Sequence, residues 1–449
     1  MSRIIKLRKG LNISLKGSAE KILGKVPMSE TYAVKPSDFP GLTPRLCVKQ
    51  GDEVKAGTPV FFDKNADKIK FVSPVSGVVE AINRGERRKL LEVVIKPDAE
   101  QVSEKYEITA DLSESREQII ELITKSGNWS FIKQRPYGII ANPNDKPKSI
   151  FISGFDTAPL LFDIDFVLSE QQQYFQKGID VLGKLTDGKV HLGVDVNDFA
   201  SCLNNIKNAE ITLFSGKHPA GNVGVQIHHI DPVNKGDIVW TVDAQHVAML
   251  GRFFSTGVYD AHKIIALCGS KVKRAQYYRI ITGAKITAFS DLIDHDGSVR
   301  YISGNVLTGT AVNKDGYMGF YANRLSVIPE GDKYEFLGWA APRLSKFSAS
   351  KSYFSWLTPN KLYDLDTNLN GGERAFVVSN QYEKVLPMDI YPVYLLKAIF
   401  AENIDKMEQL GIYEVIEEDL ALCEFVCTSK IQVQAMLRKG IELMIKEMS

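Results

Sequence analysis

The segment from Leu46 to Gly85 constrains the fold more than any other part of the chain, because tight turns divide it into short pieces. The turn sequences are Gly51-Asp52, Gly57-Thr58-Pro59 and Ser73-Pro74-Val75-Ser76-Gly77. Between these turns apolar residues recur at period two, at Val48, Val60, Phe62, Val75 and Val78. Short alternating strands joined by tight turns predict a small β-domain at this end of the chain.

The pattern V-x-x-G-D-x-V-x-x-G-x-x-V, followed by S-P-V-x-G-x-V, resembles the biotinyl/lipoyl-like barrel-sandwich domain. In that family a lysine at a hairpin tip carries the cofactor, whereas Ala66 stands at that position here. Lys64 and Lys68 lie two residues away on either side, and the Met-Lys-Met of biotin carriers is missing. A solvated turn lysine is the favoured interpretation and a carrier role is the alternative. We interpret residues 1–100 as a barrel-sandwich domain used for docking or as a scaffold.

The composition excludes several classes of protein. With 449 residues the chain is long enough for three or four domains, and its net charge of +1 argues against binding nucleic acid or an anionic membrane through bulk charge. No apolar run approaches the roughly 18 residues that span a bilayer. The N-terminus lacks the apolar core of a signal peptide, and five scattered cysteines do not form a disulfide framework. We expect a reducing, cytoplasmic compartment.

The middle of the chain alternates strand-like and helical segments. A helix is expected over Ser115–Ser126, ended by Gly127. The strand-like runs that follow are Ser149–Gly154, Val190–Val194, Ile211–Phe214, Ile238–Val242 and Lys263–Leu267, and the helical ones are Gln171–Leu185 and Val247–Phe254. This order predicts an α/β domain with a mainly parallel, Rossmann-like sheet over residues 101–270.

Two further domains are predicted after residue 270. Strand-like Tyr277–Thr282 and Val299–Ser303 bracket a short helix, Ile286–Ile293, which fits a β-grasp (SLBB-like) domain over 271–330. Residues 331–449 are predicted as a helical C-terminal domain, whose last helix has an apolar face of Val433, Leu437, Ile441, Met444 and Met448. The serine- and aromatic-rich stretch Phe347–Asn368 is predicted to be irregular. The fold class is therefore multidomain α/β.

Nucleotide, metal and nucleophile motifs give little support for catalysis by this chain. Neither G-x-G-x-x-G nor G-x-x-x-x-G-K-[ST] occurs, although the loop Gly216–Gly224, which contains Lys217 and His218, could offer N–H groups to an anion; a structural turn is the favoured alternative. His228 and His229 are placed on a probable strand, where their side chains point to opposite faces. Cys423 and Cys427 share a helix face, but an iron–sulfur cluster needs about four thiolates. No G-x-S-x-G elbow is present.

The connection Gly127–Gly138 combines aromatic and cationic side chains, namely Trp129, Phe131, Lys133, Arg135 and Tyr137. Aromatic faces beside cations suit a quinone ring and its carbonyl oxygens. In the alternative, which the residues alone favour, Trp129 and Phe131 fill the core while Lys133 and Arg135 are solvated.

Long motifs recur in order along the chain. They are L-x-x-G-L-N-I (Leu7–Ile13), G-x-W-x-x-x-x-x-R-P (Gly127–Pro136), F-S-G-x-H-P-A-G-x-V-G-x-x-I-H (Phe214–His228), S-G-x-V-L-T-G (Ser303–Gly309), E-F-L-G-W (Glu335–Trp339), L-P-M-D-I-x-P-x-x-L-L (Leu386–Leu396) and E-E-D-L-A-L-C-E-F-V-C (Glu417–Cys427). Over essentially its whole length the chain resembles the NqrA subunits of the sodium-translocating NADH:quinone reductases. It is more distantly similar to the corresponding subunit of the Rnf electron-transport complex and to the flavin subunit of respiratory complex I.

The resemblance implies a peripheral subunit on the cytoplasmic face of the bacterial inner membrane. The complex couples NADH oxidation and reduction of quinone (ubiquinone) to sodium export. Partner membrane and peripheral subunits attach this chain and carry the FMN, FAD and Fe-S centres; the chain itself is expected to bind no flavin, cluster or nucleic acid and to supply no catalytic residue. The apolar face of the C-terminal helices and Phe347–Asn368 are candidate docking surfaces.

The distant relatives cradle FMN in a G-x-G-G-A-x-F-P-T-type loop and place an acidic cluster near the nicotinamide. Here Phe131–Gly138 and Phe155–Pro159 occupy those places, and Pro136 lacks an N–H donor. Once the resemblance is taken into account, two interpretations of Gly127–Gly138 are equally well supported. In one it forms a vacated flavin pocket that holds quinone, and in the other its aromatic side chains fill the core. The candidate quinone-binding residues are Trp129, Phe131, Arg135, Tyr137, Lys217 and His218. An FMN-containing NADH dehydrogenase subunit of the Rnf/complex I type is the alternative.

Overall fold

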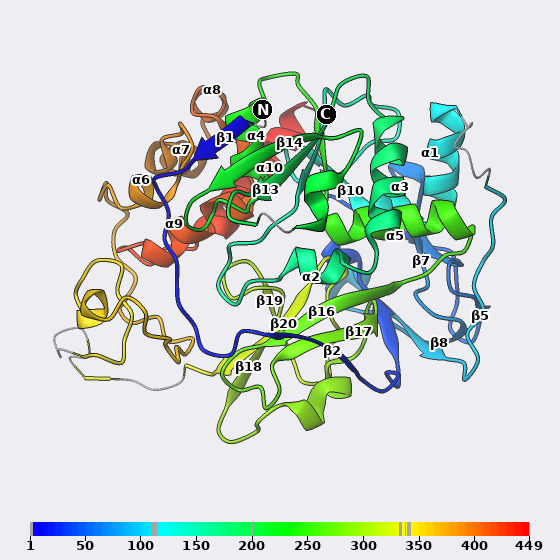
Figure 1. Cartoon of the computed structure of the whole chain (residues 1–449), viewed down its shortest axis with the longest axis horizontal. Coiled ribbons are helices and arrows are strands. Elements are labelled where there is room, and N and C mark those ends of the chain that lie inside the picture. The colour runs from blue at the N-terminus through cyan, green and yellow to red at the C-terminus, as the bar shows by residue number, and fades with distance from the viewer. Residues whose placement is uncertain are drawn as a thin grey trace.

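The computed structural model describes residues 3–108, 115–198, 201–331, 335–336, 338 and 343–448, with Met448 as backbone only. Within these ranges the strands form four sheets, and helices of the C-terminal quarter gather beside the largest one (Figure 1). The barrel-sandwich strands lie on the other side of the molecule from the helices α6 to α9, and the six-stranded sheet lies in the lower centre of the view (Figure 1).

The largest sheet has seven strands in the order β1-β14-β13-β12-β15-β10-β11. Their bounds are β1 Arg3–Lys6, β14 Glu210–Ser215, β13 Val190–Asp195, β12 Ile150–Ser153, β15 Val239–Val242, β10 Ile132–Arg135 and β11 Ile139–Ile140. The strands β1, β14, β13, β12 and β15 are parallel, while β10 runs antiparallel to β15 and β11 antiparallel to β10. Both faces of β15 are buried, as expected for a central parallel strand. The expectation of a mainly parallel sheet is confirmed.

Helix α1 (Arg116–Lys125) matches the helix predicted over Ser115–Ser126. Ser115 forms a capping box with Gln118, and Gly127 follows the C-cap with a φ of 78°. The other helices of this layer are α2 Ile164–Leu168, α3 Gln172–Gly183, α4 Val223–Ile230 and α5 Ala244–Thr256, with 3-10 turns η3 Asn128–Phe131 and η4 Cys202–Asn205.

The six-stranded sheet has the order β19-β18-β20-β16-β17-β2. Its strands are β19 Thr310–Val312, β18 Val299–Ser303, β20 Arg324–Pro329, β16 His262–Cys268, β17 Gln276–Ile281 and β2 Glu20–Lys25, and the 3-10 turn η5 spans Ile286–Leu292. The expectation that Lys263–Leu267 belongs to the parallel α/β sheet was wrong, because β16 pairs antiparallel with β17 and parallel with β20. A short apolar run is buried equally well in either sheet, so its pattern does not say which one it joins.

Two small sheets face each other in the N-terminal region. One contains β3 Tyr32–Val34, β9 Leu90–Pro97, β8 Gly77–Arg84 and β5 Glu53–Val54, and the other β4 Pro44–Leu46, β6 Pro59–Asp63 and β7 Ala66–Val72, with 3-10 turns η1 Pro36–Asp38 and η2 Glu86–Arg88. Val60 and Val75 are fully buried as the alternation predicts, but Val78 is 39% exposed and Val79 takes the inner position. Register shifts in both sheets interrupt strict alternation.

Between residues 343 and 381 the structure has one 3-10 turn, η6 Phe354–Leu357, and the chain is helical from Tyr382 onward. The elements from Tyr382 are α6 Tyr382–Val385, α7 Pro392–Phe400, α8 Ile404–Gln409, α9 Ala421–Val426 and α10 Val433–Met448, with 3-10 turns η7 Ile412–Glu414 and η8 Glu417–Leu420. Val433, Leu437, Ile441 and Met444 are fully buried on one face of α10, as predicted, while the side chain of Met448 lies outside the described residues. Across the described ranges, no helix is both long and apolar enough to cross a bilayer.

The apolar core is continuous across the predicted domain limits. A single cluster of buried side chains runs through the barrel-sandwich strands, the α/β layer and the six-stranded sheet, and a second cluster fills the C-terminal helices. The N-terminal strands also join sheets outside the barrel sandwich, since β1 pairs with β14 and β2 with β17. The limits 1–100, 101–270, 271–330 and 331–449 stay predictions.

Helices α3 and α5 cross closely at two glycines (Figure 1). A Cβ on Gly251 would overlap the carbonyl oxygen of Tyr174, and one on Gly178 would overlap that of Val247. The two backbones can therefore approach only because neither position carries a side chain.

We expect Gly251→Ala to lower the free energy of unfolding by about 2 kcal/mol, because the added methyl forces the helices apart. Gly183→Ala, at the end of α3 with open space around it, is the matched control and should stabilise the chain by about 0.5–1 kcal/mol. Urea unfolding followed by circular dichroism measures both values. Equal stability of the two variants would show that the helices are not in close contact.

Candidate functional site

Arg135, the last residue of β10, is 1% exposed and lies against the C-terminal region. Its Nη1 donates to Asp419 Oδ2 at 2.5 Å and to the Glu414 carbonyl oxygen at 3.2 Å, while Nη2 donates to Glu418 Oε1 at 2.7 Å. Burial opposes the charge of the guanidinium, but the two carboxylates outweigh it and raise the pKa of Arg135. The expectation that Arg135 is solvated was wrong.

Tyr137 belongs to the same contact. It adopts a φ of 85°, its ring meets that of Tyr413 edge to face at 6.3 Å, and its carbonyl oxygen accepts from Arg438 Nη1 at 3.0 Å. Arg438 in turn binds both oxygens of Glu417. The segment that follows β10 is thus bound to η8 and α10 at both ends.

Trp129 and Phe131 lie in the core. Trp129 is fully buried, donates from Nε1 to the Ala141 carbonyl oxygen at 2.7 Å and meets Trp240 edge to face at 5.4 Å. Phe131 is 4% exposed and stacks on His246 at 4.5 Å. These contacts agree with the alternative in which Trp129 and Phe131 fill the core.

An aromatic cluster extends from Phe131 toward the barrel-sandwich strands. Phe320 lies 5.9 Å from Phe131 and 5.0 Å from Phe39, and the Lys133 ammonium sits 3.6 Å from the centre of the Tyr321 ring. Burial lowers the pKa of Lys133. Beside Phe320 is a cavity of about 20 Å³, which holds a water molecule but no ring.

His218 and Lys217 follow β14 at the carboxyl edge of the sheet. The His218 side chain is buried; its Nδ1 lies 3.1 Å from Thr157 Oγ1, and its backbone N–H donates to Asn12 Oδ1 at 2.9 Å. Because Thr157 Oγ1 accepts from the Gly221 N–H, its own proton is available for a neutral imidazole. Burial lowers the pKa of His218 to about 4. Lys217 is exposed.

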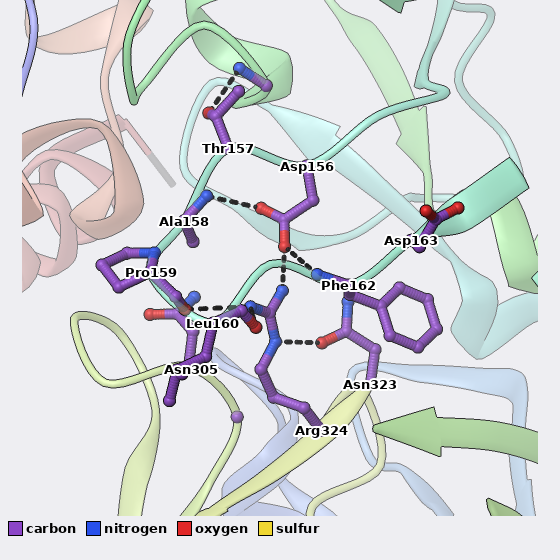
Figure 2. A network of polar contacts seen from close by, with 12 residues as sticks. Asp156, Thr157, Ala158, Pro159, Leu160, Phe162, Asp163, Asn305, Asn323 and Arg324 are labelled. Atoms are coloured by element: carbon purple, nitrogen blue, oxygen red, sulfur yellow. Dashed lines mark hydrogen bonds and ion pairs between the residues drawn. The ribbon is translucent and has the colours of Figure 1, made fainter. Parts of the chain in front are cut away.

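Sequence reasoning missed the ion pair that fixes the neighbouring loop, between Asp156 and Arg324 (Figure 2). Asp156 Oδ1 accepts from the Ala158 N–H at 2.8 Å and Oδ2 from the Phe162 N–H at 2.9 Å. Burial opposes the negative charge, but Arg324 and these N–H groups outweigh it and lower the pKa of Asp156. Asp156 lies where the distant relatives have their acidic cluster, and here both of its carboxylate oxygens are bound by groups of the same chain.

Arg324 holds the other side of the same loop. Its Nη1 donates to the Leu160 carbonyl oxygen at 2.8 Å and to that of Pro159 at 3.3 Å, and its Nε donates to Asn323 Oδ1 at 3.1 Å (Figure 2). Arg324 begins β20, so this network joins the loop after β12 to the six-stranded sheet. No sequence signal marks the pair, because its members are 168 residues apart.

The six candidate quinone-binding residues therefore form three groups. Trp129 and Phe131 lie in the core, Arg135 and Tyr137 meet the C-terminal region, and Lys217 and His218 lie beside the loop of Asp156. The loop 216–224 connects the last two groups, because Asn222 Nδ2 donates to the Glu418 carbonyl oxygen at 3.0 Å. A Cβ on Gly224 would overlap Asp419 Oδ1, so α4 can lie this close to Asp419 only because residue 224 is glycine.

The strand predicted for His228 and His229 was wrong, since both lie on α4. The short apolar run that contains them fits a helix as well as a strand. His228 Nδ1 lies 2.7 Å from Glu414 Oε2, and its Nε2 accepts from the Asp389 N–H at 3.0 Å. Both ring nitrogens are thus used to join α4 to the C-terminal region.

In the described part of the chain, no three histidine, cysteine or acidic side chains are grouped as metal ligands. Cys423 and Cys427 are buried as expected, and the Tyr382 hydroxyl donates to Cys427 Sγ at 2.9 Å. Burial raises the pKa of the Cys423 thiol. At the other end of the molecule, the turn that carries Lys64 precedes β7, and Ala66 lies opposite Ile139 and Ile140 across a pocket of about 390 Å³.

Three family models match successive parts of the chain. They are the NqrA N-terminal barrel-sandwich hybrid domain over residues 5–98, the NqrA second alpha/beta domain over 114–259 and the NQRA C-terminal domain over 264–314. The NqrA subunit of the Na(+)-translocating NADH-quinone reductase of Neisseria meningitidis serogroup A (strain Z2491) is 38% identical, covering 99% of this chain and 100% of that protein. The chain belongs to the NqrA family.

Other family members show the same coverage. The NqrA subunits of Hahella chejuensis and Pasteurella multocida are 37% and 38% identical, over 99% of this chain and 100% of each relative. Among solved structures, a chain of the air-oxidized NAD+-reducing [NiFe]-hydrogenase aligns with 75% of this chain and 64% of its own, at 12% identity and a TM-score of 0.37. That likeness is too low to support an argument.

The buried imidazole of His218 predicts a pH dependence of stability. Its pKa is about 4 in the folded chain against 6.5 for an ordinary histidine, so between these values only the unfolded chain binds the proton. Stability therefore falls as the pH drops through this window, by up to about 1.4 kcal/mol per pH unit.

The variant His218→Asn lacks this group and serves as the reference. Between about pH 7.5 and pH 5 the stability of the natural chain should fall by about 2 kcal/mol relative to the variant. Urea unfolding at both pH values measures the difference. Parallel pH profiles would mean that the folded chain also accepts the proton.

Proposed function

We propose that this chain is the NqrA subunit of a sodium-translocating NADH-quinone reductase and works there as an organising subunit without flavin or iron–sulfur cluster. The observation that carries the proposal is the full-length membership in the family. In this proposal the chain is peripheral, on the cytoplasmic face of the bacterial inner membrane, attached through partner subunits. Those partners carry the FMN, FAD and Fe-S centres and perform the electron transfer.

The use of the strand ends supports a role in organisation. In open α/β sheets, ligands bind outside the carboxyl ends of the strands, where polar groups are free to hold them. Here Asp156 after β12 and His218 after β14 are bound by other parts of the same chain, namely Arg324 and Thr157. The parallel strands also support the finer proposal of a Rossmann-like layer, and the strands beyond residue 270 that of a β-grasp, SLBB-like unit.

Quinone binding is the second candidate function, favoured by the aromatic cluster around Phe131. Rings of Phe131, Phe320 and Phe39 stand within 6 Å of their neighbours, and Lys133 lies among them with a lowered pKa. A quinone ring enters there only if these side chains move apart, because the adjoining cavity is about 20 Å³. In this proposal Arg135, Tyr137, Lys217 and His218 contact the quinone on its way to the cluster.

The organising role is tested by isolating the complex from membranes through a tag on another subunit. We expect this chain in equal amount with the tagged subunit, released from washed membranes by high salt or mild chaotrope without detergent. The chain purified alone should be colourless and yield no flavin on denaturation. Stoichiometric FMN in the isolated chain would contradict the proposal and support an FMN-containing NADH dehydrogenase subunit.

Quinone binding is tested by irradiating the intact complex with a photoreactive quinone. Labelled peptides are expected from 127–138 and 216–224, and excess unlabelled quinone should prevent the labelling. Lys217→Ala should reduce labelling of the second peptide without changing stability, because the side chain is exposed, whereas Lys64→Ala is the matched exposed control. Labelling confined to other subunits would leave the organising role and remove the quinone role.

A further inference from the structure

The outer face of α7 is aromatic instead of polar. Tyr391, Tyr394 and Phe400 are 61%, 52% and 80% exposed, and with Lys397 they form a stripe at every third residue. The inner face is apolar as well, being made of Val393, Leu395, Leu396 and Ile399. A helix that is hydrophobic all round is normally buried on all sides. The outer side of α7 is therefore exposed, although its apolar sequence predicts that another element packs against it.

A groove of about 630 Å³ lies beside this stripe, between α7 and α8. Tyr394, Ala398 and Leu410 give it an apolar lining, and Lys397 and Lys406 give it two positive charges. No carboxylate lines it among the described residues. The volume is in the range of about 300–1,000 Å³ that holds apolar groups in protein binding sites.

The two lysines lack acidic partners. In the described part of the chain no carboxylate lies within ion-pair distance of either ammonium group, and Lys397 Nζ lies 5.8 Å from the centre of the Phe376 ring. By contrast, Lys235 binds Glu408 of α8 at 2.8 Å. The groove is thus complementary to an occupant that is apolar on one side and negatively charged at its edge.

Exposed apolar side chains are frequent in the segment of the chain that leads to the groove. Of the twenty large apolar side chains that are exposed among the described residues, twelve lie between Phe336 and Phe400; the remaining eight are spread over the rest of the chain. Phe376, which Lys397 faces, belongs to this segment. Exposed apolar side chains are thus concentrated in the segment that contains α7, which is consistent with interaction surfaces in this part of the chain.

We propose that the groove between α7 and α8 binds an amphipathic segment of another subunit of the complex, with apolar side chains in the groove and carboxylates beside Lys397 and Lys406. This rests on the proposed function, because it requires an assembled partner. A neutral quinone ring would leave both ammonium groups without a counter-charge and would cover only part of α7. A lipid headgroup surface would neutralise the lysines but would leave the groove unfilled.

The first experiment reverses the two charges. Lys397→Glu/Lys406→Glu should lower recovery of this chain with a tagged partner subunit by about tenfold or more, because like charges then face each other. Lys397→Arg/Lys406→Arg should keep the recovery, and Lys64→Glu/Lys314→Glu, at exposed positions of other domains, is the matched control. Circular dichroism and thermal unfolding should be unchanged in all three, since the side chains are exposed.

The second experiment places a photoreactive benzophenone amino acid at Phe400, or at exposed Val78 as control, in the assembled complex. Phe400 should crosslink to a segment of another subunit that carries both apolar and acidic residues. Crosslinks only to lipid, to quinone or to a second copy of this chain would overturn the proposal, as would unchanged recovery of the charge-reversed variant. If the natural chain is recovered with no other subunit, the proposed function fails. If the natural chain is recovered with its partners and the charge-reversed variant is recovered equally well, only the assignment of the groove fails.

Discussion

The buried charge of Arg135 holds the α/β layer against the C-terminal helices. Removing a guanidinium from water costs several kcal/mol, and the cost is offset only if carboxylates and hydrogen bonds surround it. Those partners, Glu418 and Asp419, are 283 and 284 residues away in the chain. The segment after β10 and the turn η8 therefore reach their positions together, and the position of Tyr137 and of Gly224 follows from the same contact.

Arg324 has the corresponding role at the carboxyl end of β12. It is 2% exposed, and it holds the loop of Asp156 from the side of the six-stranded sheet. Arg324 thus occupies the polar groups of the loop that follows β12, at the carboxyl edge where an α/β sheet usually binds its ligand. Arg135 lies at the opposite edge of the parallel strands, because β10 is antiparallel to β15 and Arg135 pairs with Val239. Polar groups that could hold a ligand are here used for contacts between distant segments of the chain.

Local patterns in the sequence were enough to predict local structure. Ser115 with Gln118 and Gly127 marks both ends of α1, and the spacing from Val433 to Met444 gives the buried face of α10. Contacts between distant segments were not accessible in this way. The strand β1 was missed because four residues carry no periodicity, and its partner β14 lies over 200 residues later. For the same reason the sequence placed Arg135 in solvent and gave no sign of Arg324.

Two aromatic segments show what composition leaves open. Trp129 and Phe131 come with nearby cations, as do Tyr394 and Phe400, yet the first pair is buried and the second exposed. The difference lies in spacing and context: the first pair sits in a connection packed among β7, β11, α1 and α5, whereas the second belongs to a helix whose opposite face is already apolar. The periodicity of a helix indicates when one of its faces lacks a partner, so the stripe at every third residue from Tyr391 could have been found from the sequence alone. A short connection has no such period, and only the packing around it decides whether its rings fill a core or meet a ligand.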